Sequence, residues 1–375
     1  MTPNYANLFA TPENVIYVNN AAVGKIPRTS IAVMKRFLDD LAIQGEPPLA
    51  DILAKFEEMR KYAGKLIAGA PENIAFMTNT SEGLSIALHS IPWQPGDNII
   101  VQQDAFPASH YILEYSFPQI EKRYLRVEDG HQIFDNIESH LDKNTRALIF
   151  DHVNFLTGYR LDLKQLGELC QTYHIYSIID GIQAAGAVEI GLESAGIDFF
   201  AAGGLKWLLS PMGTGLLFVR QEIIPQLKPV HVGWLSAQWE DFASFYPLKP
   251  LHHTARRFEW ANTNLTGLYG FVESLKMFSS IGVAELERLI LTTTEYLITE
   301  LRQREIVVLA HRLPQHRSGI VSFRHLKVSS SQIFEQLKMH NVICSAREGY
   351  VRLAVHFYNT LEEMQEIIRL IDEIL

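Results

Sequence analysis

Runs of apolar residues alternate with amphipathic segments along most of the chain, and this alternation predicts strands separated by helices. Apolar runs of strand length predict strands at 73–78, 98–102, 122–127, 147–152, 175–180, 199–202 and 215–220. Between them, helical periodicity predicts helices at 83–90, 134–141, 163–173 and 189–195. This order is typical of an α/β fold in which helices cover both faces of a mostly parallel sheet.

The pattern changes near residue 265, where two consecutive helical segments begin a second, smaller set of elements. This set predicts helices at 265–279, 283–303, 330–340 and 360–375, and strands at 306–310, 319–324, 342–344 and 350–355. We therefore expect a large domain over residues 14–275 and a small C-terminal α/β domain over residues 276–375. We expect the first 13 residues to pack on the small domain, and residues 234–254 to form a long loop.

Composition narrows the class of protein. A chain of 375 residues, 47% hydrophobic and 20% charged, is longer than one core usually supports, so two domains are expected. A net charge of −9 and a pI near 5.9 argue against nucleic acid or an acidic membrane as partner. Two cysteines, no metal-binding Cys motif, no signal peptide and no apolar run of membrane-spanning length predict a soluble cytoplasmic protein without a metal.

A lysine follows one predicted strand and an aspartate ends an earlier one. Lys206 comes after an apolar run and two glycines, 26 positions beyond Asp180 (206 − 180). A pyridoxal-phosphate enzyme needs such a pair, because the lysine forms a Schiff base and the carboxylate keeps the pyridine nitrogen protonated. Alone, either residue fits equally well as a surface lysine or a helix-capping aspartate.

The segment Met77-Thr78-Asn79-Thr80-Ser81-Glu82-Gly83 joins a strand to a helix. Asn79 and Glu82 fit a capping box, and the exposed N–H groups with the hydroxyls of Thr80 and Ser81 form a candidate anion site. A plain capped helix explains the same residues. Neither GxGxxG nor GxxxxGK[ST] occurs, so a dinucleotide or nucleoside triphosphate site has no support.

Three other candidates lie at strand ends, where ligands gather in open α/β sheets. Phe106 can stack on a flat ring, although alone it fits a core position. Gln183, three residues after Asp180, and Asn154 can each reach the phenolic oxygen of such a ring.

Together these motifs resemble fold-type I pyridoxal-phosphate enzymes of the class V aminotransferase family, which includes cysteine desulfurases, kynureninases and isopenicillin N epimerase-like proteins. The resemblance runs from Tyr17 to Thr360. Its specific parts are Thr80-Ser81-Glu82-Gly83, Asp180-Gly181-Ile182-Gln183, Lys206, Arg257-Phe258-Glu259 with Asn262, and Val351-Arg352-Leu353.

The resemblance implies a role for each of these positions. Lys206 holds pyridoxal 5'-phosphate, Asp180 pairs with its ring nitrogen, and Phe106 stacks on the ring. The phosphate is bound by Thr80 and Ser81, and by Asn262 reaching into the neighbouring subunit of a homodimer with shared active sites. Arg352 grips the substrate carboxylate, with Asn20 assisting.

The chain departs from the family pattern at three places, so its expected phosphate site differs in detail from that of many relatives. Leu205 stands where many relatives have histidine, Gly203 where many have serine, and Trp260-Ala261-Asn262 where many have Gly-Gly-Thr or Ala-Gly-Thr.

The chemistry implied is removal of the α-proton of an amino acid by Lys206, and its outcome stays open. An aminotransferase producing a keto acid from a small amino acid is the first hypothesis. A lyase or epimerase is the second, and a non-catalytic binding protein the third. A desulfurase needs a reactive cysteine on a mobile loop. Cys170 fits a helix and Cys344 a strand, so neither position suggests it.

Overall fold

The computed structural model describes residues 5–375 apart from residues 13, 128–132, 240–243, 245, 262 and 305. Its main sheet has seven strands in the order β2-β8-β7-β6-β5-β3-β4. The strands are β2 (Ile74–Met77), β3 (Asn98–Gln102), β4 (Glu121–Leu125), β5 (Thr145–Asp151), β6 (Tyr176–Asp180), β7 (Phe199–Gly203) and β8 (Gly215–Val219). β8 runs antiparallel to both neighbours and the other pairings are parallel. The predicted strands and the mostly parallel sheet are confirmed.

Both faces of this sheet are buried, which explains why its strands are nearly continuous apolar runs. Side chains alternate between two hydrophobic clusters. In β5, Ile149 joins the cluster that includes Leu84 and Leu113, whereas Phe150 joins the cluster on the opposite face. The first face is covered by α3 (Thr80–Ser90) and α4 (Ala108–Ser116).

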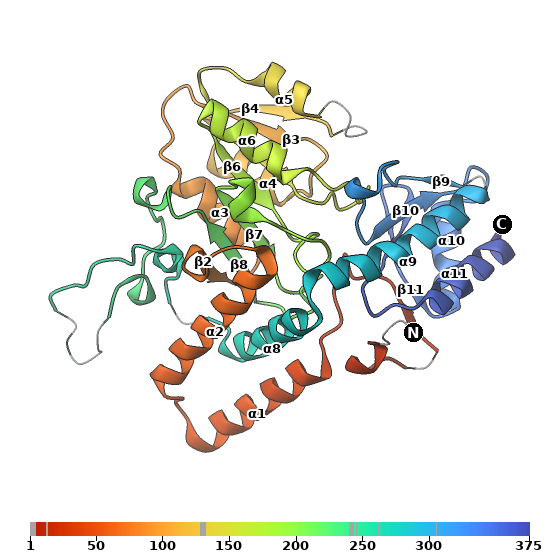
Figure 1. Cartoon of the computed structure of the whole chain (residues 1–375), viewed down its shortest axis with the longest axis horizontal. Helices are drawn as coiled ribbons and strands as arrows, with labels where there is room; N and C mark the ends of the chain where they lie inside the picture. Colours follow the sequence, from red (N-terminus) through yellow and green to blue (C-terminus); the bar gives the residue numbers. More distant parts are fainter. Residues whose placement is uncertain are drawn as a thin grey trace.

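The other helices of this part surround the sheet (Figure 1). They are α1 (Arg28–Gln44), α2 (Leu49–Ile67), α5 (Ile133–His140), α6 (Leu163–Tyr173), α7 (Leu192–Ala195) and α8 (Leu265–Ile281). Short 3₁₀ turns occur at η1 (Ala6–Leu8), η2 (Pro71–Asn73), η3 (Ile224–Gln226), η4 (Trp234–Ser236), η5 (Ala255–Phe258) and η6 (Pro314–His316). The helix predicted at 189–195 was too long, because only its last four residues are helical after Gly191.

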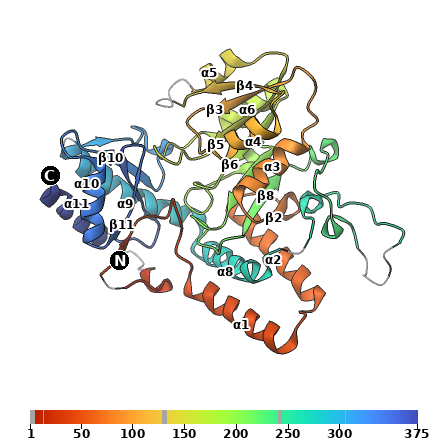
Figure 2. The same cartoon turned by 180° about the vertical axis from the view of Figure 1, so that it is seen from behind.

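The C-terminal part has its own antiparallel sheet, in the order β12-β13-β10-β9. Its strands are β9 (Val307–Val308), β10 (Ile320–Arg324), β12 (Ser345–Arg347) and β13 (Tyr350–Ala354). The helices α9 (Val283–Gln303), α10 (Ser330–Met339) and α11 (Leu361–Ile374) pack with this sheet around a separate hydrophobic cluster. Figures 1 and 2 show these elements together on one side of the main sheet, with α9 running between the two parts.

The N-terminal segment lies against this C-terminal part. β1 (Ile16–Tyr17) pairs in parallel with β11 (Val342–Ile343). The Phe9 ring lies 4.3 Å from that of Tyr358. The expected packing of the first 13 residues on a small domain stays a prediction. The domain boundary at 275/276 stays a prediction, and it falls inside α8, which packs on α1 and α2.

Candidate active site

Lys206 lies in a tight turn after β7, at the carboxyl end of the main sheet. The turn is closed by hydrogen bonds from Gly204 N to Thr214 O (2.7 Å) and from Leu209 N to Lys206 O (3.0 Å). The N-terminal segment crosses directly over it, and Gly24 N donates to Leu205 O at 2.7 Å. A Cβ at Gly24 would come within 1.9 Å of the Lys206 carbonyl oxygen, so only glycine allows this approach.

The Lys206 ammonium is held among charged groups in a mostly buried position. Burial lowers its pKa to about 8, with the Arg352 charge acting in the same direction and that of Asp180 opposing it. Its Nζ lies 5.4 Å from the centre of the Phe106 ring. Phe106 is 46% exposed, so the interpretation of this residue as part of the core was wrong. The Phe106 ring is available to cover a ligand above Lys206.

Asp180 ends β6 and is buried. Its Oδ1 accepts a hydrogen bond from Ile182 N at 2.9 Å. Burial raises its pKa to about 6, against the lowering effects of that hydrogen bond and of the Lys206 charge. Lys206 and Asp180 therefore lie close enough for each charge to shift the other's pKa.

Asp151 was not among the predicted site residues. It ends β5, in register with Asp180 on β6, and is also buried. Its Oδ2 accepts from Phe106 N at 3.4 Å. Burial raises its pKa well above the usual range, and the Asp180 charge adds to this effect. Its place at the end of the predicted strand 147–152 was a usable signal.

The N-terminus of α3 points toward the end of β7. Asn79 Oδ1 accepts from Glu82 N at 2.9 Å, as predicted, but the Glu82 carboxylate accepts from Thr78 N (2.7 Å) rather than from Asn79 N, so the capping box is only half formed. Thr80 Oγ1 accepts from Gly203 N at 2.9 Å. Within the described residues, the N–H groups of Thr80 and Ser81 have no acceptor.

Three predicted polar residues are hydrogen-bonded within the chain. Asn154 Nδ2 donates to Asp104 O (2.8 Å), and its Oδ1 accepts from the backbone of Leu156 and Thr157. Gln183 Oε1 accepts from Trp207 Nε1 (2.6 Å), and its Nε2 donates to Ala21 O (3.2 Å).

Asn20 is also engaged on both sides of its amide. Its Nδ2 donates to Ala354 O (2.8 Å), and its Oδ1 accepts from the Tyr358 hydroxyl (2.7 Å). Direct ligand contacts by Asn154, Gln183 and Asn20 stay predictions. As the structure stands, these three side chains fix the loops around Lys206.

Arg352 lies on β13, which has β12 on one side and β10 on the other. It is 2% exposed, so it is not a solvated arginine on an edge strand. Its Nε donates to Ser345 Oγ (3.2 Å) and its Nη1 to Phe155 O (2.8 Å). Burial, followed by the Arg347 charge, lowers its pKa to about 10. Since its charge lowers the pKa of Lys206, the second sheet brings this guanidinium to the same site.

The two cysteines are buried, and burial raises the pKa of both thiols, that of Cys344 to about 12. Cys170 lies in α6 as predicted, whereas Cys344 lies between β11 and β12 rather than inside a strand. Neither thiol is disposed to form the thiolate that nucleophilic attack on sulfur needs.

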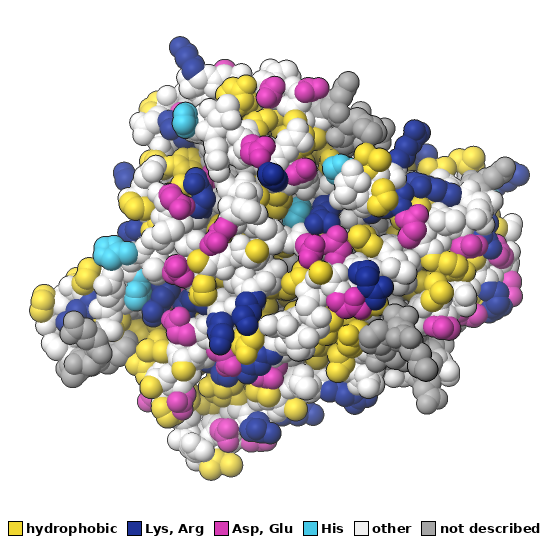
Figure 3. All heavy atoms as spheres, viewed as in Figure 1, with side chains coloured by type: hydrophobic (Ala, Val, Ile, Leu, Met, Phe, Trp, Pro, Cys, Tyr) yellow, Lys and Arg dark blue, Asp and Glu magenta, His cyan; other side chains and the backbone are white. Residues whose placement is uncertain are grey.

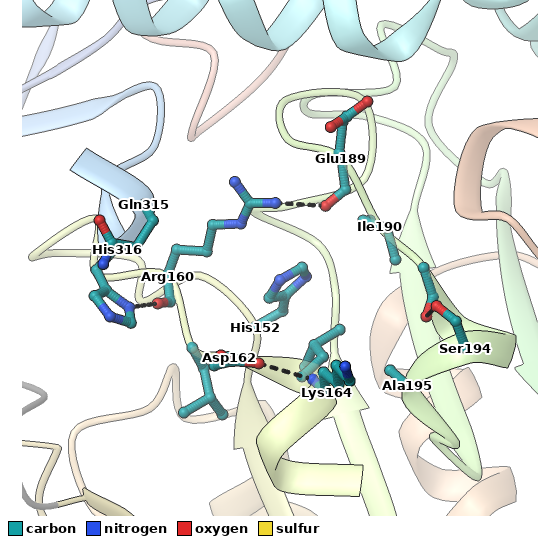
Figure 4. A pocket seen from close by; sticks show the side chains of 13 residues that line it. His152, Arg160, Asp162, Lys164, Glu189, Ile190, Ser194, Ala195, Gln315 and His316 are labelled. Atoms are coloured by element: carbon teal, nitrogen blue, oxygen red, sulfur yellow. Dashed lines mark hydrogen bonds between the residues drawn. The ribbon is translucent and has the colours of Figure 1, made fainter. Parts of the chain in front are cut away.

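A separate cavity of about 310 Å³ lies near the seam between the two parts of the chain (Figure 4). His152, Arg160, Lys164, Ser194 and His316 are among its lining residues, and none of the predicted site residues is. This cavity is therefore distinct from the site around Lys206.

Three further features of the described residues concern surface charge, membrane-spanning helices and metal-binding groups. Acidic and basic side chains are interspersed on the face seen in Figure 3. Across the described residues, no helix is long and apolar enough to cross a membrane. The same residues contain no group of three or more His, Cys, Asp or Glu side chains able to hold a metal ion.

Comparison with known proteins gave matches over nearly the whole chain. The sequence model of the family described as Aminotransferase class-V matches residues 16–367. An uncharacterized aminotransferase, YcbU of Bacillus subtilis, is 26% identical over 97% of this chain and 95% of its own length. A probable cysteine desulfurase of Methanothermobacter thermautotrophicus is 23% identical over 96% and 94%. Isopenicillin N epimerase of Streptomyces clavuligerus is 27% identical over 59% and 57%.

Solved structures share the fold. C-DES carrying glycine covalently linked to its PLP cofactor superimposes with a TM-score of 0.90 at 23% identity, over 99% of this chain and 100% of that one. A cysteine desulfurase from Thermococcus onnurineus gives a TM-score of 0.86 at 21% identity, over 100% and 98%.

Proposed function

The chain belongs to the class-V aminotransferase family, whose members are pyridoxal-phosphate-dependent enzymes, and from that premise we propose that it transfers the amino group of a small amino acid through Lys206. The observation that carries this proposal is the meeting in one mostly buried site of Lys206, which follows β7, Asp180, which ends β6, and Arg352 on β13. The likeness to known proteins leaves the reaction open, so amino transfer stays the finer proposal.

The residues present suit pyridoxal 5'-phosphate. The free N–H groups of Thr80 and Ser81 at the start of α3 offer donors to a phosphate, and the helix dipole favours its charge. Gly203 leaves this place open, since a Cβ there would lie 3.2 Å from Thr80 Oγ1 and 3.4 Å from Thr80 N. Where many relatives add a serine hydroxyl, this chain has only the Gly203 N–H, which is already bonded to Thr80.

The cofactor supplies an aldehyde that condenses with amines and a ring that takes up the electrons of a broken bond at the α-carbon. Asp180, as a carboxylate, would keep a proton on the ring nitrogen of the bound cofactor. Lys206 Nζ would hold its aldehyde and, as a free amine, would take the α-proton of the substrate. Its lowered pKa raises the share of neutral amine near neutral pH, and only the neutral amine can accept a proton.

Arg352 and Phe106 position the reactants. The guanidinium has five N–H groups, of which two are used by Ser345 and Phe155, so three remain for a substrate carboxylate. Phe106, whose ring centre lies 5.4 Å from Lys206 Nζ, would cover the cofactor ring and restrict water there. Asn20, fixed by Ala354 and Tyr358, shapes the wall beside the N-terminal segment.

The test has two parts. Borohydride reduction of the purified, cofactor-loaded protein, followed by peptide mapping, should place the label on Lys206, and a label elsewhere would overturn the assignment. Single-turnover mixing with individual amino acids should then produce a keto acid in an amount equal to the cofactor. The variant Lys206→Ala should bind the cofactor without a reducible link, and Lys228→Ala, a lysine outside the candidate site, serves as the matched control.

A lyase or epimerase is the second candidate, because relatives with such names are 27% identical to this chain, although over 59% and 56% of its length against 97% for the aminotransferase. Release of ammonia with the keto product, without transfer to the cofactor, would identify a lyase. Exchange of the α-proton with solvent and loss of optical purity would identify an epimerase. Since the family is one of enzymes, a non-catalytic binding role is no longer favoured.

We propose that the enzyme is a cytoplasmic homodimer with shared active sites. Tyr246, Leu248 and Trp260 expose 78%, 80% and 40% of their surface, and burial of these large apolar side chains against a second copy of the chain would stabilise a dimer. Asn262, expected to reach the cofactor phosphate of the neighbouring subunit, lies outside the described residues. Sedimentation equilibrium should give twice the chain mass of 42.6 kDa, and a monomer with full activity would refute shared sites.

A further inference from the structure

Two aspartates end adjacent parallel strands at the candidate active site. The Cα atoms of Asp151 and Asp180 are partners in the register of β5 and β6. In a parallel pair, residues in register point to the same face of the sheet and lie about 5 Å apart. Ile149 and Ile178, two positions earlier, both belong to the cluster under α3, so both aspartates face that side.

Ionisation of both carboxyl groups at the same time is unfavourable in these surroundings. Asp151 and Asp180 are 7% and 5% exposed. Asp104 adds a third negative group nearby, and its effect reaches Asp151. Lys206 supplies the facing positive charge, and Arg352 acts on Lys206 from the second sheet. Two buried carboxylates beside each other share a proton, as like charges in one site cannot both ionise.

We propose that Asp151 is a neutral carboxylic acid in the working enzyme and holds the one proton of the Asp151–Asp180 pair, which leaves Asp180 charged. This inference rests on the proposed function, in which Asp180 must stay ionised beside the ring nitrogen. Asp151 is then a positioning residue, which acts through Asp180 and through the loop that carries Phe106.

The contacts of the two carboxyl groups indicate which one is ionised and which one is protonated. Asp180 is stabilised as a carboxylate by the Ile182 N–H at 2.9 Å and by the Lys206 charge. Among the described residues, the Asp151 carboxyl accepts only the longer contact from Phe106 N, at 3.4 Å, and the attraction of Lys206 is opposed there by the charges of both Asp180 and Asp104. A neutral Asp151 still accepts that bond on Oδ2 and has an O–H to donate toward Asp180. The proton therefore belongs on Asp151.

The same contact ties the proton to the position of the aromatic ring. Phe106 N–H is held by Asp151, and the Phe106 ring lies 5.4 Å from Lys206 Nζ. A charged Asp151 would attract Lys206 and compete with Asp180 for it. A neutral Asp151 keeps the loop in place and leaves the full attraction of Lys206 to Asp180.

The first experiment uses the ligand-free protein and infrared spectroscopy, so it does not depend on cofactor chemistry. A protonated carboxyl has a carbonyl stretch that a carboxylate lacks. The difference spectrum between wild type and Asp151→Asn at pH 7 should contain this band. In Asp180→Asn, the pH at which the band disappears should fall by at least about one unit, since a neighbouring negative charge is gone. Absence of the band in wild type, or no change in Asp180→Asn, would overturn the proposal.

The second experiment follows the absorbance of the bound cofactor with pH. Asn has the shape of a neutral Asp, so Asp151→Asn should shift the midpoint pH of this absorbance change by less than about 0.5 units. If Asp151 were charged, its loss would lower the midpoint by more than about one unit. The absence of a borohydride-reducible link at Lys206 would refute the proposed function. The infrared experiment tests the protonation of Asp151 independently of that result.

Discussion

Replacement of Arg352 by lysine is the most direct test of the proposal that Arg352 binds the substrate carboxylate. Lysine keeps the positive charge but loses the planar fork that can hold a carboxylate through two parallel bonds. In the structure, the guanidinium is aimed by Ser345 Oγ and Phe155 O, at 3.2 and 2.8 Å, and has three N–H groups left. Loss of a charge-assisted hydrogen bond costs about 1.5–3 kcal/mol, so the amino acid's dissociation constant should rise roughly 10- to 150-fold.

The assay is a titration of the cofactor-loaded protein with amino acids, followed by cofactor absorbance. Arg347→Lys is the matched control, because Arg347 is an exposed arginine on the neighbouring strand whose charge also reaches Lys206. Amines without a carboxylate should bind both variants and the wild type equally. Unchanged affinity in Arg352→Lys, or an equal loss in Arg347→Lys, would refute the reasoning that Arg352 recognises the carboxylate.

Three other perturbations give separate tests. Burial lowers the pKa of His356 to about 4, so below about pH 6.5 the unfolded chain binds a proton that the folded chain does not. As pH falls from about 6.5 to 4, roughly 3 kcal/mol of unfolding free energy should therefore be lost. In urea titrations, His356→Gln should reduce this dependence of the unfolding free energy on pH. Arg60→Met leaves the buried Glu259 carboxylate without its ion pair and should reduce the unfolding free energy by about 3–5 kcal/mol, whereas the exposed Arg369→Met should leave it nearly unchanged. Cys344→Ala should not change sulfur release from cysteine, since the pKa of that thiol is raised to about 12; a loss of all sulfur release would instead make this residue a nucleophile.

Most of the fold could be predicted from the sequence, but less of the candidate site. The strands of the main sheet are buried on both faces, so their apolar runs stood out. The helices α1 and α2 were not predicted, although apolar positions such as Val33, Phe37 and Leu41 recur at helical spacing. β12 was also missed, because three residues with two exposed side chains leave no apolar run.

The partnership of Asp151 with Asp180 could not be predicted, because it depends on which strands are neighbours. Chain order alone does not place β5 beside β6. In the same way, only the folded chain shows that Asn154 and Gln183 have hydrogen-bond partners of their own. Local sequence showed which side chains stand at strand ends, and the packing of the sheet determined which of them meet.

Phe155 contributes to two neighbours through different parts of itself. Its carbonyl oxygen accepts from Arg352, and its ring meets the Phe106 ring edge-on, with centres 5.6 Å apart. The carbonyl is common to all amino acids, whereas the ring is not. A different side chain at position 155 would therefore change the packing of the Phe106 ring and leave the backbone hydrogen bond to Arg352 in place. Under the proposed function, such a change would alter the preference for bulky or slender substrates while the carboxylate contact is kept.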